Sequence, residues 1–123
     1  MIYNQRMECL DAAGLKNLQG ERLQHFVKRV YEQSPFYRKK MMEQGVAPKD
    51  IRSIDDIVRL PFTIKEDLRD HYPFGLFTKP FKEVREIHVS SGTTGNPTVV
   101  GYSEEDIELW AEVIARSLCC AGA

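Results

Sequence analysis

The sequence predicts a mostly helical α+β fold, with N-terminal helices followed by a β-hairpin and a final helix. Apolar residues recur with helical spacing along much of residues 1–80. Further on, β-favouring residues flank a short segment rich in serine, threonine and glycine, which predicts strand, loop and strand. A last amphipathic pattern follows Ser103. At 123 residues the chain has material for one domain, helical over residues 1–80 and strand–loop–strand–helix over residues 81–123.

Two helices are predicted in the first 45 residues. Asp11 can cap a helix that begins near Ala12, and its apolar stripe consists of Leu15, Leu18, Leu23, Phe26, Val27, Val30 and Tyr31. Ser34 as N-cap and Pro35 at the first helical position open the second helix, and Gly45 can close it in a left-handed conformation. Its buried side is expected to carry Phe36, Tyr37, Met41 and Met42.

Two short helices are expected between residues 46 and 70. The first follows a turn at residues 47–50 and is capped by Ser53, with Ile54, Ile57 and Val58 buried. For the second, Thr63 and Glu66 fit a capping box, in which the hydroxyl and the carboxylate satisfy N–H groups of the first turn.

The C-terminal third is expected to hold two strands and a helix. The strands cover residues 84–89 and 97–102, with Pro97 at the first position of its strand, where a missing N–H is tolerated. Ser103 then caps a helix whose first turn is acidic, which suits the positive end of the helix dipole. One apolar face of this helix consists of Ile107, Trp110, Ile114 and Leu118.

The loop between these strands is the candidate binding site. It consists of Ser90, Ser91, Gly92, Thr93, Thr94 and Gly95, referred to below as the Ser/Thr/Gly loop. Two glycines allow the backbone N–H groups to turn inward together and form a concave anion site, to which the hydroxyls add donors. A phosphate or polyphosphate is the expected ligand. The spacing does not fit a Walker A loop, and a hairpin loop with solvated hydroxyls explains the same composition equally well.

Residues 90–98 resemble the phosphate-binding loop of adenylate-forming enzymes, the acyl-CoA synthetases and their relatives. The continuation to Tyr102, together with Trp110 and Arg116, is similar to phenylacetate-CoA ligases in particular. Residues 34–38, 60–69 and 72–76 match the same family. The resemblance extends from about Glu8 to the last residue and covers only the N-terminal portion of such an enzyme.

This resemblance implies a two-step reaction. A carboxylate attacks the α-phosphorus of ATP and releases pyrophosphate, Mg²⁺ assists, and the acyl-adenylate then acylates coenzyme A. The Ser/Thr/Gly loop would contact the β- and γ-phosphates. The chain ends before the family's adenine and acyl pockets, its magnesium-binding acid and its catalytic lysine, so we assign no catalytic or metal-binding residue and expect the chain to be inactive alone.

Composition narrows the other possibilities. The chain is 28% charged with a net charge of −1, which gives no field for nucleic acid or an anionic membrane. It has no apolar run of membrane-spanning length and no secretory signal, so we expect a cytoplasmic protein. The histidines and cysteines lack metal-ligand spacing.

Two further hypotheses remain open. The chain could be a non-catalytic interaction or dimerisation module derived from such a ligase, a homo-oligomer formed through apolar surface that the rest of the enzyme would cover. It could also be a regulatory domain that binds anions without any preference for nucleotides.

Overall fold

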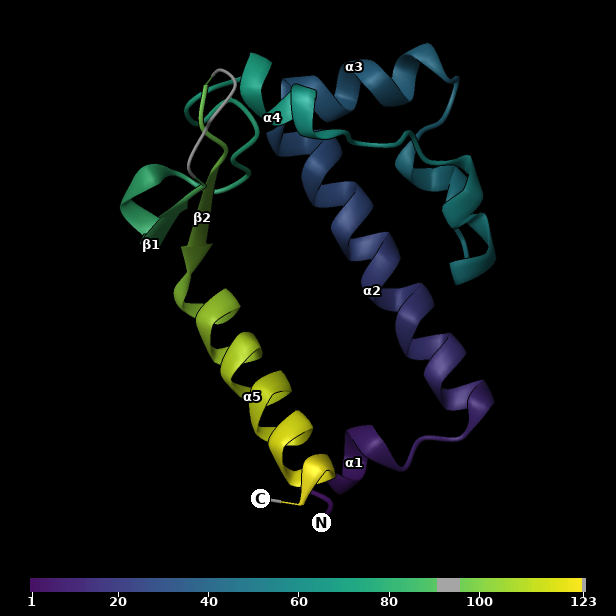
Figure 1. Ribbon diagram of the computed structural model, residues 1–123. Coiled ribbons are helices and arrows are strands. Elements are labelled where there is room, and N and C mark those ends of the chain that lie inside the picture. Colours follow the sequence, from purple (N-terminus) through teal and green to yellow (C-terminus); the bar gives the residue numbers. More distant parts are fainter. Residues whose placement is uncertain (91–95, 123) are drawn as a thin grey trace.

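The computed structural model describes residues 1–90 and 96–122, and the predicted α+β fold class is confirmed. Two long helices, α2 and α5, are joined at one end by α3, α4 and the β-hairpin and at the other end by α1 (Figure 1). The elements in chain order are α1 (Gln5–Glu8), α2 (Ala12–Gln33), α3 (Pro35–Glu43), η1 (Pro48–Asp50), η2 (Ile54–Arg59), α4 (Lys65–Asp70), η3 (Phe81–Glu83), β1 (Val84–Val89), β2 (Val99–Ser103) and α5 (Glu104–Ala121).

The first predicted helix boundaries are confirmed. The Asp11 carboxylate accepts from the Gly14 N–H, so Asp11 caps α2 as expected. Pro35 is the first residue of α3, and Gly45 adopts a φ of +67° just beyond it. Ser34 is the N-cap residue and is fully buried, but its side chain makes no capping bond.

The core lies between α2, α3 and the segment that follows α3. Its buried apolar residues are Val27, Met41, Val46 and Ile51, with Leu23, Tyr31 and Leu60 packed against them. Five residues expected in the interior are instead exposed to solvent: Leu15, Phe26, Met42, Ile57 and Val58. Ile51, which comes before the predicted short helix, contributes to the core in place of Ile57 and Val58.

The caps of the two short helices agree with the prediction in part. Ser53 is the N-cap residue of η2, as expected, and Asp56 accepts from the N–H groups of Arg52 and Ser53, although the Ser53 side chain itself makes no capping bond. At α4, the capping carboxylate belongs to Asp67, which accepts from the Ile64 N–H at 2.9 Å. The predicted box of Thr63 and Glu66 was therefore wrong by one residue.

The β-hairpin is the two-stranded antiparallel sheet formed by β1 and β2, in register at Val89↔Val99 and Ile87↔Gly101. The bounds of β1 agree with the prediction, whereas β2 begins two residues later than expected and Pro97 precedes it. Gly101 is required by close packing, because a Cβ atom there would lie 2.6 Å from Cε2 and Cζ of Phe77.

The last helix begins as predicted. The Ser103 hydroxyl accepts from the Asp106 N–H, and the Asp106 carboxylate accepts from the Ser103 N–H, which completes a capping box. Among the residues that the structure describes, no helix has both the length and the apolar composition needed to cross a bilayer.

The N-terminal segment contacts the far half of α5 and closes the arrangement (Figure 1). The Met1 ammonium donates to the Cys119 carbonyl at 3.2 Å, and Asn4 Nδ2 donates to Glu112 Oε1 at 2.7 Å. Arg116 lies 3.7 Å from Glu8. We call these three contacts the clasp.

Candidate functional site

The β-hairpin brings the two ends of the Ser/Thr/Gly loop together. Beyond the last ladder pair, the Ser90 N–H donates to the Thr98 carbonyl at 3.0 Å. The Thr98 N–H donates to Ser90 Oγ at 3.3 Å. The chain therefore leaves and re-enters the hairpin through a closed neck. Within the neck the Ser90 hydroxyl accepts one hydrogen bond, and it can still donate its proton.

The other predicted ligands lie outside the described residues. These are Ser91, Gly92, Thr93, Thr94 and Gly95, whose assignment as a phosphate site remains a prediction. Asn96, on the far side of the loop, is exposed. The neck itself was not predicted, although a serine and a threonine flanking a glycine-rich segment of this length are a signal that could have indicated it.

An aromatic cluster connects the hairpin to α5. The Tyr102 and Trp110 rings stack with their centroids 5.4 Å apart, and the His88 ring lies 4.8 Å from Tyr102 and 5.8 Å from Trp110. His88 Nε2 also lies 3.2 Å from a carboxylate oxygen of Glu86. These contacts fix the orientation of the hairpin against the first turns of α5.

A cavity of about 210 Å³ lies beside β2. Its wall is largely apolar and includes Leu76, Phe77 and Val99, while Arg29, Lys79 and Asp106 supply charge. Burial raises the pKa of Asp106, but hydrogen bonds from Ser103 and the positive charges of Lys79 and Arg29 outweigh it, so the net pKa is lowered. Asp106 is therefore ionised at neutral pH and offsets part of the positive charge on the wall.

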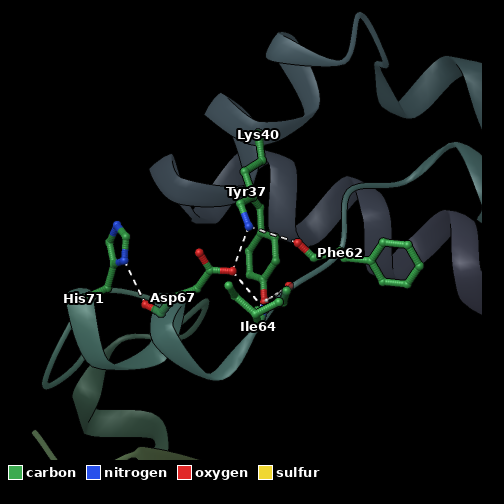
Figure 2. Close-up of polar contacts among 7 residues, drawn as sticks. Tyr37, Lys40, Phe62, Ile64, Asp67 and His71 are labelled. Carbon is green, nitrogen blue, oxygen red and sulfur yellow. Dashed lines mark hydrogen bonds and ion pairs between the residues drawn. The ribbon is translucent and has the colours of Figure 1, made fainter. Parts of the chain in front are cut away.

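A polar cluster centred on Asp67 joins α3 to α4 (Figure 2). Lys40 Nζ lies 2.7 Å from Asp67 Oδ2 and donates to the Phe62 carbonyl at 2.9 Å. The Thr63 hydroxyl donates to the Tyr37 hydroxyl at 3.3 Å. The hydrogen bond from the Ile64 N–H, followed by the bond from Lys40, lowers the pKa of Asp67.

This cluster positions α4 and offers no open metal site. Lys40 and Asp67 satisfy each other, and their side chains are only 27% and 16% exposed. Within residues 1–90 and 96–122, no group of three or more His, Cys, Asp or Glu side chains could hold a metal ion.

The relatives of this chain are acid–CoA ligases, although no family model matches it. It is 55% identical to the phenylacetate-coenzyme A ligase of Thermus thermophilus, over all of this chain and 28% of that protein. It is 47% identical to the phenylacetate-coenzyme A ligase of Escherichia coli K12, over 99% of this chain and 29% of that protein. Over nearly its whole length, the chain is similar to one part of these phenylacetate-coenzyme A ligases.

Solved structures of CoA ligases share the fold. The crystal structure of 2-hydroxyisobutyryl-CoA ligase in complex with 2-HIB-AMP and CoA matches with a TM-score of 0.82 and 37% identity, over 90% of this chain and 24% of that one. An open conformation of that ligase also matches with a TM-score of 0.82, at 32% identity over 94% of this chain. The chain spans about a quarter of the length of the phenylacetate-CoA ligases and of these solved chains.

Proposed function

We propose that the β-hairpin presents the ATP phosphate-binding loop of an AMP-forming acid–CoA ligase, with Ser90, Ser91, Gly92, Thr93, Thr94 and Gly95 as the phosphate contacts. The closed neck at Ser90 and Thr98 is the observation that supports this proposal most directly. A neck of this kind holds the chain on both sides of the loop close together and so restricts the conformations of the loop. Less conformational entropy is then lost when several N–H and hydroxyl donors converge on one anion. Sequence identity to ligases that use a carboxylic acid and coenzyme A supports the same assignment.

The reaction of the complete enzyme would convert ATP, an aryl acid and coenzyme A to acyl-CoA, AMP and pyrophosphate. In phosphoryl and adenylyl transfer the protein acts chiefly by positioning and by stabilising charge, so a ring of donors over the departing phosphates has a direct role. Mg²⁺ and coenzyme A belong to the complete enzyme in this proposal. The chain by itself would bind nucleotide phosphates without completing catalysis, and its cytoplasmic localisation remains a prediction.

A second candidate function is a non-catalytic interaction module that forms a homo-oligomer. The observation that favours it is the exposed apolar face of α5, on which Trp110, Ile114 and Leu118 are each about half exposed. A face of this kind on an otherwise charged helix favours association with another polypeptide.

The phosphate proposal is tested by calorimetric titration of pyrophosphate and of ATP into the 123-residue chain. We expect dissociation constants in the millimolar range or weaker, which corresponds to a binding free energy of roughly −4 kcal/mol or less favourable. Each donor gains only on the order of 1 kcal/mol over its hydrogen bond to water. The double variant Gly92→Val, Gly95→Val should lose this binding, because a branched Cβ blocks the backbone conformations that only glycine reaches easily.

A matched control is Gly45→Asn. Gly45 has a φ of +67° and lies away from the hairpin. A Cβ atom there would meet no other atom within 4 Å, and asparagine tolerates this conformation. The control should bind pyrophosphate like the wild type. Equal binding by the double variant would place the anion site elsewhere. Equal affinities for ATP and for inorganic phosphate would favour the regulatory anion-binding domain. ATP–pyrophosphate exchange by this chain would contradict the proposed inactivity.

A further inference from the structure

One face of α5 is left uncovered by the described part of the chain. Its apolar residues Leu109, Trp110, Val113, Ile114 and Leu118 are 44–55% exposed. They recur at i, i+4 and i+8 and therefore form two adjoining rows on the helix surface. We call this surface the α5 face. It continues onto the hairpin through a groove that Trp110 and Val113 line together with Val100 and Tyr102.

The polar side of the same helix is already occupied by the chain's own residues. Lys79 lies 2.6 Å from Glu105, and Arg85 lies 3.4 Å from Glu104. In the clasp, Asn4 donates to Glu112 at 2.7 Å. The polar intramolecular contacts therefore lie on one side of α5. On the apolar side, Trp110 stacks on Tyr102 and is still 44% exposed.

The length of the relatives indicates what covers this face. The matched phenylacetate-CoA ligases and 2-hydroxyisobutyryl-CoA ligase chains are about four times as long as this chain. The fold of this chain matches about a quarter of a 2-hydroxyisobutyryl-CoA ligase chain with a TM-score of 0.82. We propose that the α5 face and the adjoining hairpin form a docking surface for the remaining three quarters of a ligase fold, and that this surface binds it even when it is supplied as a separate polypeptide.

The hairpin favours this occupant over a second copy of the chain. A two-stranded sheet is marginally stable alone and gains most from additional strands or from packing on a larger body. Two copies that pair through α5 would bury the helix faces and leave the outer strand edges open. A larger polypeptide can cover the helix face and the strand edge together.

The test is co-expression of the affinity-tagged 123-residue chain with the Thermus thermophilus ligase from which the segment matching residues 1–123 has been deleted. Co-elution of that polypeptide at equal stoichiometry is expected. The double variant Ile114→Asp, Leu118→Asp should lower its yield roughly tenfold or more, because central apolar contacts carry most of the energy of such interfaces. Val58→Asp introduces one such charge at a residue that is 85% exposed on η2, and co-elution should be retained.

Hydrogen exchange supplies a second measurement. Docking should protect the backbone amides of α5 and of β1 in the complex, and circular dichroism should show unchanged helicity in the isolated variants. The inference would be overturned by co-elution that survives both aspartates or by an equal loss of co-elution with Val58→Asp. It would also be overturned by a homodimer that persists in the presence of the second polypeptide. It rests on the ligase match rather than on phosphate binding, so a failed pyrophosphate titration leaves it standing.

Discussion

At the scale of single residues, Asp67 is a carboxylate that serves two elements at once. It accepts from the Ile64 N–H, which caps α4, and from Lys40 on α3. Lys40 also lies 4.9 Å from the centroid of the Phe36 ring, which shields it further. A partly buried pair that also serves as a helix cap couples two elements, unlike an isolated surface ion pair.

Asp67→Asn should lower the urea midpoint of unfolding at pH 7. Because the folded-state pKa of Asp67 is lowered, its ionised form contributes stability above its unfolded pKa of about 4, and this contribution is lost as pH falls through the folded pKa. The difference between variant and wild type should therefore shrink at pH 3. Asp70→Asn, at an exposed residue of the same helix, is the control. A difference of equal size at both pH values would show that charge is not the cause.

Several caps could be read from the sequence and others could not. Asp11 and Ser103 each stand alone before a long helix, and both caps were predicted correctly. Near α4 the sequence predicted a cap from Thr63 and Glu66, whereas the capping carboxylate is that of Asp67, which also pairs with Lys40, 27 residues away. Local sequence carries no information on such a contact.

At the scale of elements, β2 depends on a glycine. Gly101 faces the Phe77 ring closely enough that any Cβ would overlap it. The aromatic segment that contains Phe77, whose ring also packs against Phe74, thereby lies close against the strand. This packing joins the segment after α4 to the hairpin that carries the Ser/Thr/Gly loop.

Gly101→Ala should destabilise the chain by about 1–3 kcal/mol, the usual cost of overpacking. Urea unfolding followed by Trp110 fluorescence measures the change. Phe77→Leu should lower the cost of the alanine in a double-mutant cycle, since it removes the ring that the new methyl group would meet. Additive effects of the two substitutions would contradict the contact.

The sequence predicted the type of an element more often than it predicted which residues of that element are buried. The periodicity of α2 indicated the helix, yet Phe26 in its stripe is exposed while Val27 is buried. In η2 a 3₁₀ helix repeats every three residues, so Val58 lies about 120° around from Ile54 and faces solvent. An assumed α-helical period had placed both residues on one buried side.

At the scale of the whole molecule, more large apolar residues of the described chain are exposed than are buried. Five apolar residues of α5 alone remain about half exposed, whereas six apolar residues of the described chain are buried. The sequence had predicted the apolar face of α5, but whether the chain covers that face itself depends on where α2 and α5 lie. For the site, the strands and the neck residues were within reach of the sequence, and the phosphate contacts remain a prediction.

In the absence of a partner, we expect this chain to self-associate at tens of micromolar through the α5 face. Light scattering after size exclusion should give a mass above 14.2 kDa for the wild type. Ile114→Asp, Leu118→Asp should shift it towards the monomer, and Val58→Asp should not. A monomeric wild type whose Trp110 is shielded from acrylamide would contradict this prediction.

The clasp has a consequence for the order of folding. Its contact between Met1 and Cys119 joins residues 118 apart, so the chain entropy lost in closing it exceeds that of any local contact. Helix α2 and the hairpin need only short loops, and we expect them to form before the rate-limiting barrier and the clasp after it. Asn4→Ala should then accelerate unfolding and leave the refolding rate unchanged in stopped-flow experiments, with Asn17→Ala as the control. A refolding rate slowed in proportion to the lost stability would place the clasp in the folding nucleus.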